Sequence, residues 1–416
     1  MYCLIGKKLG HSYSKEIHES LNKENYNLIE LDKLDSFFQE KHFKGCNVTI
    51  PYKKEVIKYC DYLSETATRT QSINSIVNIK GKLHGYNTDY DGLKYLIDYN
   101  DISIENKTIA ILGNGSTSRT ILILCKDLNA KKIFVYARNP NHDEEHLNDI
   151  ENNQNINIIF NATPVGMYPN NANSLGINLN KYKNLDAVVD LIYNPHETEI
   201  LKTARKLKIK SVNGLLMLIQ QAVKSSEIFH QTIYSNDVTN EIYKNILFKT
   251  LNFVFIGMPM SGKSFFSKYI SRKYGKEVVD IDNIIKKNEN ATIESIFKLK
   301  GEKYFRLLET NAIKEISKSH NLAISTGGGA ILNEKNIDLL KQNGIIIFLD
   351  VPLSLLETFN PMNRPLLRDK SNLRKLYQDR NPLYKKYSDI TVIKNSYDET
   401  ETFGRIEAKI NEYFNS

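Results

Sequence analysis

Short apolar runs alternate with stretches of helical spacing along almost the whole chain. The runs IIF, VVDLIY, LAIST and IIIFLD are each followed by a segment that is expected to be helical. Apolar strands separated by helices are typical of parallel sheets that are covered on both faces. The pattern therefore predicts α/β domains with parallel sheets.

Two of the predicted strands lead into a glycine loop followed by a helix. One is KTIAILG, at Lys107–Gly113, and the other is NFVFIG, at Asn252–Gly257. Each is expected to begin a nucleotide-binding sheet of its own. The junction between them is predicted near residues 245–251 with almost no linker, and 416 residues suffice for two or three domains.

Composition narrows the class of protein. With 41% hydrophobic residues, 25% charged residues and no apolar run near 18 residues, the chain is expected to be globular and cytoplasmic, without a membrane partner. The four cysteines form no CxxC pair and are predicted to be reduced thiols. Nearly all of the net charge of +8 follows Phe248, but no dense basic block is interleaved with aromatic residues. Nucleic acid is therefore not an expected partner, whereas polyphosphate and small carboxylates are.

The second glycine loop fits the pattern GxxxxGK[ST] throughout. In such a loop the backbone N–H groups and the following helix N-terminus surround the β-phosphate of a nucleoside triphosphate. Lys263 is expected to neutralise the β- and γ-phosphate oxygens, and the Ser264 hydroxyl to ligate Mg²⁺. The predicted ATP-binding residues are Gly257, Met258, Pro259, Met260, Ser261, Gly262, Lys263 and Ser264.

The residues that follow this loop narrow the phosphate acceptor. They comprise two aspartates in VVDIDN, Arg306 and Glu309 in GEKYFRLLE, the glycines of STGGGA, Arg364 in NRPLL, and Arg380 in DRNPLY. Each of these residues alone is commonly structural. Together, arginines and a carboxylate facing a phosphate loop predict a small acceptor that carries a carboxylate and a hydroxyl.

This ordered set resembles shikimate kinase over nearly all of residues 251–416. The resemblance implies that Asp282 holds and deprotonates the attacking hydroxyl, and that Arg364 comes from a closing lid and joins Lys263 at the transferring phosphoryl group. The segment before Arg364 looks short and lacks an arginine usual in that family, which bears on nucleotide affinity. The other implied contacts are Arg306 and Arg380 with the substrate carboxylate, backbone contacts from Gly328 and Gly329, and Asp280 with Mg²⁺ through water.

The first glycine loop, GNGSTSR, is a weaker signal. It keeps two glycines of a dinucleotide fingerprint but not the third, so a plain strand–helix turn is an open alternative. The next strand ends at Arg138 without an acidic residue, and an arginine there suits the 2′-phosphate of NADP(H). The predicted cofactor residues of this loop and strand are Gly113, Asn114, Gly115, Ser116 and Arg138.

Lys53 and Asp89 form a candidate acid–base pair in the first part of the chain. They lie in NVTIPYK and NTDYDG, two segments flanked by polar side chains. A lysine beside a carbonyl can polarise it and deliver a proton as a hydride arrives, while a neighbouring aspartate orients the lysine.

These segments, with LGHSYSKEIHESLN, SINSIV, FNATPVGM, DLIYNPHET and GLLMLIQQA in order, resemble shikimate dehydrogenase from residue 1 to about 245. The resemblance implies that Ser12 and Ser14 bind the substrate carboxylate. It also implies ring contacts from Thr49, Asn74, Asn87, Tyr193 and Gln221, and a nicotinamide side lined by Asn161, Thr163 and Met217.

Together the two resemblances imply a fusion that reduces 3-dehydroshikimate to shikimate with NADPH and then phosphorylates shikimate with ATP. The expected architecture is a substrate domain at 1–92 completed by helices at 214–248, a Rossmann-like NADP domain at 93–213, and a three-layer P-loop kinase at 251–416. A metabolite-sensing regulator without turnover, or a quinate-type dehydrogenase fused to another small-molecule kinase, are the alternatives. The sequence indicates no particular oligomeric state.

Overall fold

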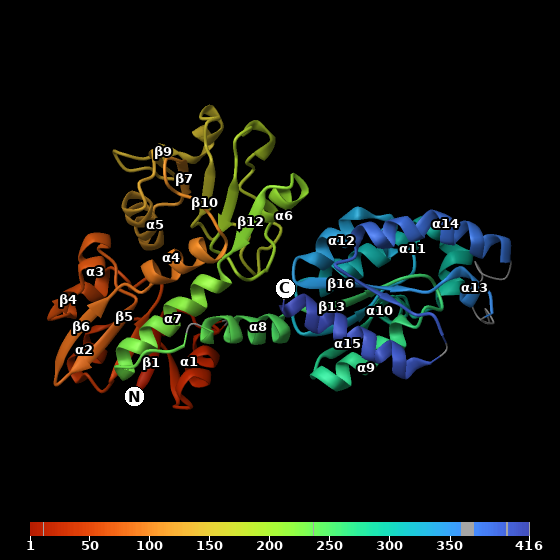
Figure 1. The fold of residues 1–416 in the computed structure, drawn as a ribbon, viewed down its shortest axis with the longest axis horizontal. Helices are drawn as coiled ribbons and strands as arrows, with labels where there is room; N and C mark the ends of the chain where they lie inside the picture. Colours follow the sequence, from red (N-terminus) through yellow and green to blue (C-terminus); the bar gives the residue numbers. More distant parts are fainter. Residues whose placement is uncertain (11, 236, 359–369, 397, 416) are drawn as a thin grey trace. The chain divides into compact units, whose positions relative to one another are not determined.

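The chain folds into two compact units, Met1–Tyr243 and Lys244–Ser416 (Figure 1). The computed structural model describes residues 1–416 except 11, 236, 359–369, 397 and 416. Within those described residues, no helix is both long enough and apolar enough to cross a membrane.

The first unit begins with a mixed sheet. Its strands are β1 (Tyr2–Gly6), β2 (Tyr26–Glu30), β3 (Gly45–Val48), β4 (Tyr62–Leu63), β5 (Ser75–Ile79) and β6 (Lys82–Tyr86), in the order β2-β1-β3-β5-β6-β4. The helices among them are α1 (Ser14–Asn22), α2 (Asp35–Glu40) and α3 (Glu65–Thr70). Strand β5 runs antiparallel to both β3 and β6. Lys80 and Gly81, with positive φ values of 51° and 83°, close the tight hairpin between β5 and β6. This hairpin departs from the parallel sheets that the sequence pattern predicts.

The second sheet of the first unit is parallel throughout. It contains β7 (Thr108–Leu112), β8 (Lys132–Ala137), β9 (Glu145–His146), β10 (Ile158–Asn161), β11 (Ala187–Asp190) and β12 (Lys210–Asn213), with α5 (Ser116–Asp127) and α6 (Glu199–Lys206) between them. The order is β12-β11-β10-β7-β8-β9, with neighbouring strands parallel. Numbered within the sheet this is 3-2-1-4-5-6, the Rossmann order that the fold prediction requires.

Two long helices join these sheets. Helix α4 (Asp89–Tyr99) leads from the first sheet to the second, and α7 (Leu215–His230) returns and packs along it (Figure 1). The pair can pack closely because Gly92 has no side chain, and a Cβ there would lie 2.6 Å from the Met217 carbonyl oxygen. Helix α7 also contacts α1 and β5 of the first sheet. Helix α8 (Val238–Thr250) follows.

The second unit is built around a five-stranded parallel sheet. Its strands are β13 (Asn252–Ile256), β14 (Glu277–Asp280), β15 (Leu322–Ser325), β16 (Gly344–Asp350) and β17 (Ile390–Ile393), in the order β14-β15-β13-β16-β17. The helices are α9 (Lys263–Tyr274), α10 (Ile281–Glu289), α11 (Ile293–Ile316), α12 (Glu334–Lys341), α13 (Leu353–Leu356), α14 (Lys370–Tyr387) and α15 (Glu399–Asn415). Two hydrophobic clusters, one on each face of the sheet, separate it from the helices and make the predicted three layers.

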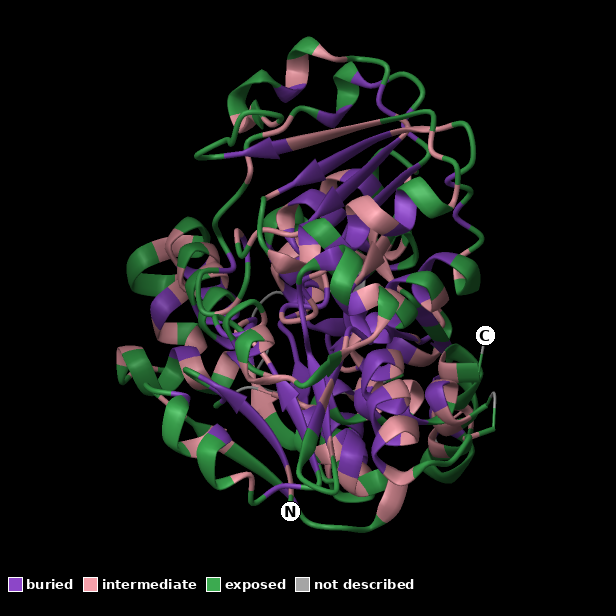
Figure 2. Cartoon of the chain, turned by 90° about the vertical axis from the view of Figure 1, so that its left-hand side faces the viewer, coloured by how far each residue is buried: buried purple, intermediate pink, exposed green. Residues whose placement is uncertain are grey.

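A larger share of the residues is buried in the central strands than in the helices. Strands β13 and β16 are buried at nearly every position, as expected for central strands covered on both faces. Figure 2 shows buried residues concentrated in the strands, while helices expose one side.

Candidate active sites

The Lys53 and Asp89 side chains meet in the first unit. Lys53 lies in the loop after β3 and Asp89 is the first residue of α4, and the Lys53 Nζ is 2.6 Å from the Asp89 Oδ2. The two side chains are only 13% and 6% exposed. The Ile73 N–H donates to the Lys53 carbonyl at 2.8 Å, which fixes the backbone of the lysine. The geometry therefore presents a sheltered ammonium that one carboxylate orients.

Asn74 connects this pair to helix α7. Its Nδ2 donates to the Asp89 Oδ1 at 2.9 Å and to the Gln221 Oε1 at 3.1 Å. Its Oδ1 accepts from the Thr88 N–H at 2.7 Å. Asn87 is engaged nearby, since its Nδ2 donates to the Thr70 and Thr120 hydroxyls at 2.8 and 3.1 Å. Three of the predicted substrate residues thus lie in one buried polar network with Asp89.

The serine pair and Tyr193 come together through Tyr13. The Ser12 hydroxyl donates to the Ser14 hydroxyl at 3.0 Å at the start of α1. Between them in sequence, the Tyr13 ring lies 5.6 Å from the Tyr193 ring. Burial raises the pKa of Tyr13 to about 12 and that of Tyr193 above its ordinary value, so both are neutral hydrogen-bonding groups. Thr49 sits at the end of β3, where its N–H donates to the Ile5 carbonyl at 2.9 Å.

The loop after β7 fits a dinucleotide. Gly113 has a φ of 99°, and a Cβ there would approach the Ala162 carbonyl oxygen to 3.2 Å. Gly115 has nothing within 4 Å of such a Cβ, and helix α5 begins at Ser116. An open glycine at a helix N-terminus lets a pyrophosphate approach backbone N–H groups. The fully buried Asn161 accepts from the Thr163 N–H and hydroxyl, which fixes the loop beside Gly113.

The loop after β13 fits a triphosphate with Mg²⁺. Gly262 has a φ of 96°, and α9 begins at Lys263, so the N-terminus of this helix adjoins the loop. The Lys263 Nζ donates to the Gly257 and Met258 carbonyls at 3.0 and 2.8 Å. The Ser264 hydroxyl donates to the Asp280 Oδ2 at 2.7 Å. A hydroxyl and a carboxylate that meet at a phosphate loop are the oxygen ligands that Mg²⁺ prefers.

The glycine loop after β15 packs directly against the other kinase residues. A Cβ on Gly327 would lie 2.5 Å from the Glu309 Oε1 and 3.3 Å from the Asp282 Oδ1. A Cβ on Gly328 would lie 2.9 Å from the Pro259 ring, and one on Gly329 would lie 2.3 Å from the Arg306 Nη2. The loop consequently holds the aspartate, the arginine and the phosphate loop around one space.

Arg306 is held by carboxylates on its own helix. A break at Gly301, with φ of 77°, starts a new helical segment inside α11 that carries Arg306 and Glu309. The Arg306 Nη1 donates to the buried Glu309 at 2.8 Å, and its Nη2 to Glu302 at 2.9 Å. Burial raises the pKa of Glu309, Arg306 opposes this shift, and the charges of Asp282 and Arg380 also reach it. Arg380, only 5% exposed, therefore shares this site, whereas Arg364 lies outside the described residues.

The contacts of three residues were not anticipated from the sequence. The buried Asp190 accepts from Asn161 at 2.9 Å and from the Thr198 hydroxyl. The Tyr384 hydroxyl donates to the Gly328 carbonyl, which anchors the glycine loop. The buried Lys394 Nζ lies over the Phe266 ring, 5.2 Å from its centre. Asp190 and Lys394 each end or follow a parallel strand, and that position is the only sequence signal for them.

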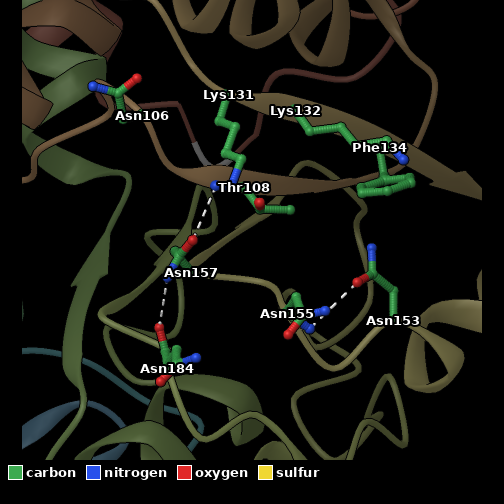
Figure 3. Close-up of a pocket in the computed structure, with 9 residues that line it drawn as sticks. All are labelled: Asn106, Thr108, Lys131, Lys132, Phe134, Asn153, Asn155, Asn157 and Asn184. Atoms are coloured by element: carbon green, nitrogen blue, oxygen red, sulfur yellow. Dashed lines mark hydrogen bonds between the residues drawn. The ribbon is translucent and has the colours of Figure 1, made fainter.

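A separate pocket of about 410 Å³ lies where strands of the Rossmann sheet begin, at the end of the sheet away from the glycine loop (Figure 3). It is lined by Asn106, Thr108, Lys131, Lys132, Phe134, Asn153, Asn155, Asn157 and Asn184. Asn157 spans it, accepting from the Thr108 N–H at 3.0 Å and donating to the Asn184 carbonyl at 3.0 Å. These residues lie in the first half of β7 and β8 and in the segments that precede β7, β8, β10 and β11. The glycine loop follows the opposite end of β7, so the pocket is not part of the dinucleotide site.

Fold and sites define two enzyme classes in one chain, a Rossmann oxidoreductase and a P-loop small-molecule kinase. Residues 4–76 match the family model "Shikimate dehydrogenase substrate binding domain", and residues 259–411 match "Shikimate kinase". The shikimate dehydrogenase (NADP(+)) of Clostridium perfringens is 36% identical over 266 residues, covering 59% of this chain and 98% of its own. That of Clostridium beijerinckii is 34% identical over 264 residues, covering 58% and 96%.

Solved structures agree with these relatives. A chorismate mutase/shikimate 5-dehydrogenase fusion protein from Clostridium acetobutylicum matches with a TM-score of 0.55 and 36% identity, covering 59% of this chain and 96% of that one. Shikimate dehydrogenase 1 from Peptoclostridium difficile matches with a TM-score of 0.55 and 35% identity, covering 59% and 97%. The chain belongs to the shikimate dehydrogenase family and carries a shikimate kinase domain after it. It is a fusion of two shikimate-pathway enzymes, which confirms the resemblances seen in the sequence.

Proposed function

We propose that the chain catalyses two consecutive steps on one small molecule. The first unit reduces 3-dehydroshikimate to shikimate with NADPH, and the second transfers the γ-phosphoryl group of ATP to the shikimate 3-hydroxyl. The observation that carries the proposal is that a sheltered Lys53–Asp89 pair and a complete phosphate loop occur in the same chain. Four free cysteines, of which three are buried, support a cytoplasmic location.

In the first reaction, Lys53 is the proton donor. NADPH supplies a hydride when it is bound. The Lys53 ammonium polarises the substrate carbonyl and gives its proton to the oxygen, while Asp89 keeps the ammonium in place. Ser12 and Ser14 bind the substrate carboxylate in this proposal. Ring contacts come from Thr49, Asn74, Asn87, Tyr193 and Gln221. Asn161, Thr163 and Met217 border the nicotinamide, and Gly113 to Ser116 with Arg138 hold the rest of the cofactor.

In the second reaction, Asp282 is the base. It removes the proton from the attacking hydroxyl, while Arg306 and Arg380 hold the carboxylate of the ring. ATP with Mg²⁺ supplies the phosphoryl group when it is bound. The Lys263 Nζ, which donates to two loop carbonyls, would bind phosphate oxygens of the nucleotide and stabilise the charge that develops there. Ser264 would ligate the metal and Asp280 would hold it through water, while Gly328 and Gly329 contact the ring through their backbone.

One coupled assay tests both steps. The purified chain receives 3-dehydroshikimate and NADPH, and the loss of absorbance at the NADPH band is followed before and after Mg-ATP is added. We expect NADPH oxidation without ATP, and shikimate 3-phosphate only after ATP is added. A folded chain that binds NADPH but leaves it unoxidised would contradict the first step. Added shikimate that remains unphosphorylated would contradict the second step.

A further inference from the structure

The loop that follows β8 carries a carboxylate that the sequence pattern does not place near the cofactor. In Rossmann domains the second strand often ends in an acidic residue that binds the ribose 2′-hydroxyl of NAD(H). Here β8 ends at Ala137 and the exposed Arg138 follows. The chain then returns over six residues to Glu144, just before β9 begins.

Glu144 is hydrogen-bonded to the glycine loop. Its Oε2 accepts from the Asn114 Nδ2 at 2.9 Å and from the Asn141 N–H at 2.8 Å, and its Oε1 accepts from the Asn141 Nδ2 at 3.0 Å. Asn114 also donates to the Asn139 carbonyl at 3.1 Å. Since Asn114 lies between Gly113 and Gly115, the carboxylate lies beside the loop that fits the dinucleotide.

The Glu144 carboxylate is held in its ionised form. Partial burial raises the pKa of Glu144, but hydrogen bonds from Asn141 and Asn114 and the charge of Arg119 outweigh burial and hold it below the ordinary value. The loop carries the exposed cation Arg138 and, six residues later in sequence, an anion that Asn114 and Asn141 hold in place. A phosphate group and a carboxylate that share such a site repel each other, whereas a ribose hydroxyl can donate to the carboxylate.

We propose that Glu144 is a specificity-determining residue for the cofactor. Its negative charge counteracts the positive charge of Arg138 and reduces the preference of the dehydrogenase for NADP(H) over NAD(H). The inference rests on the proposed dehydrogenase function. It goes beyond that function because it assigns the discrimination between the two cofactors to a named side chain. Glu144 acts through its charge and through its contact with Asn114.

The test measures binding, not turnover. The kinase site of the full chain is first filled with saturating Mg-ATP. Isothermal titration with NADP⁺, NAD⁺, 2′,5′-ADP and 5′-AMP then gives the contribution of the 2′-phosphate at the Rossmann site. Glu144→Gln retains the side-chain length and one acceptor oxygen, which can still accept from the Asn114 Nδ2 and the Asn141 N–H. We expect this variant to bind NADP⁺ and 2′,5′-ADP about tenfold more tightly, with NAD⁺ and 5′-AMP changed by less than about twofold. The gain shrinks as salt is added.

Asp143→Asn is the matched control. It makes the same charge change one residue away, where the side chain is fully exposed and contacts His142 instead of the glycine loop. An equal gain in this variant, or an unchanged ratio of NADP⁺ to NAD⁺ affinity in Glu144→Gln, would overturn the inference alone. A wild-type chain that binds none of the four probes would overturn the cofactor assignment and the inference together.

Discussion

The Lys53 Nζ lies 2.6 Å from the Asp89 Oδ2, although 36 residues separate them in sequence. The loop after β3 delivers the lysine and the first turn of α4 delivers the aspartate. Asn74, in the segment just before β5, donates to the second carboxylate oxygen at 2.9 Å. Both oxygens of Asp89 are therefore engaged, and the ammonium has a defined position in a sheltered site.

Replacing Lys53 should separate the two activities of the chain. We expect Lys53→Ala to lower kcat/KM for 3-dehydroshikimate reduction by roughly 10²- to 10⁴-fold, because the proton donor is lost. Phosphorylation of added shikimate should be unchanged, because the kinase residues lie in the other compact unit. NADPH oxidation and ATP consumption, measured on the same preparation, check both statements.

The neighbouring Lys54 is exposed and serves as the control for this substitution. Lys54→Ala should leave both activities within about twofold of wild type, since surface substitutions rarely matter. Retained reductase activity in Lys53→Ala would refute the catalytic role. Loss of kinase turnover in a folded Lys53→Ala chain would refute the independence of the two reactions.

The parallel sheets could be predicted because their central strands are mostly apolar. VVDLIY and IIIFLD become β11 and β16, both buried on two faces. The hairpin β5–β6 was not predicted, because its alternation is weak and its turn, Lys80-Gly81, depends on local backbone conformation.

The kinase and dehydrogenase residues could be proposed because they cluster in ordered motifs, but their partners could not. Nothing in the local sequence relates Glu144 to Asn114, 30 residues away, since the contact depends on how the β8–β9 loop folds back. The same holds for Tyr384, which reaches Gly328 across 56 residues. Such contacts come from tertiary packing, which local periodicity does not encode.

His18 should make the first unit sensitive to acid. Burial, reinforced by the nearby His230, lowers the pKa of His18 to about 3, whereas an unfolded histidine titrates near 6.5. Between pH 6.5 and pH 3, His18 is protonated in the unfolded chain but neutral in the folded chain. The free energy of unfolding therefore falls as the pH drops through this range. At pH 4.5 we expect the loss to reach about 3 kcal/mol.

His18→Phe tests this acid sensitivity. In the wild-type chain the centres of the His18 and Tyr26 rings are 4.2 Å apart. The phenylalanine keeps a ring stacked on Tyr26 and removes the titrating group. The measurement is the urea concentration at which peptides covering α1 lose protection from hydrogen exchange, at pH 7 and pH 4.5. The midpoint should shift less with pH in His18→Phe than in wild type. The exposed His142→Gln should behave as wild type, and an equal pH shift in all three proteins would refute the assignment.

Lys276 should stabilise the second unit by donating hydrogen bonds to carbonyl groups at the C-terminal end of α8. Its Nζ donates to the Phe248 and Leu251 carbonyls at 2.7 and 2.8 Å and to the Asn321 Oδ1 at 3.1 Å. Lys276→Met leaves these acceptors without their donor inside the protein, at a cost of about 2–5 kcal/mol. Residual kinase activity after graded heating should fall sooner than in wild type, while reductase activity is retained.

The exposed Lys273→Met is the control for Lys276, since Lys273 pairs only at the surface with Glu407. Its effect on stability should be small, because solvent screens an exposed ion pair. Equal heat resistance of Lys276→Met and Lys273→Met would show that the buried lysine does not hold the helix end. The same contacts predict that a kinase fragment starting at residue 252 is less stable than one that retains the second half of α8.

Gly329→Ala should weaken shikimate binding by the kinase without unfolding it. The new methyl group would lie 2.3–2.6 Å from the Arg306 guanidinium, which Glu302 and Glu309 hold in place. The Arg306 guanidinium can move at little cost to protein stability, but it binds the shikimate carboxylate well only from its original position. We expect KM for shikimate to rise about tenfold and KM for ATP to change by less than about twofold.

Gly404→Ala, in open space on α15, is the control for this substitution. It should leave both constants unchanged and stabilise the helix by about 0.5–1 kcal/mol. If Gly329→Ala raised KM for ATP instead, the glycine would belong to the nucleotide side of the site.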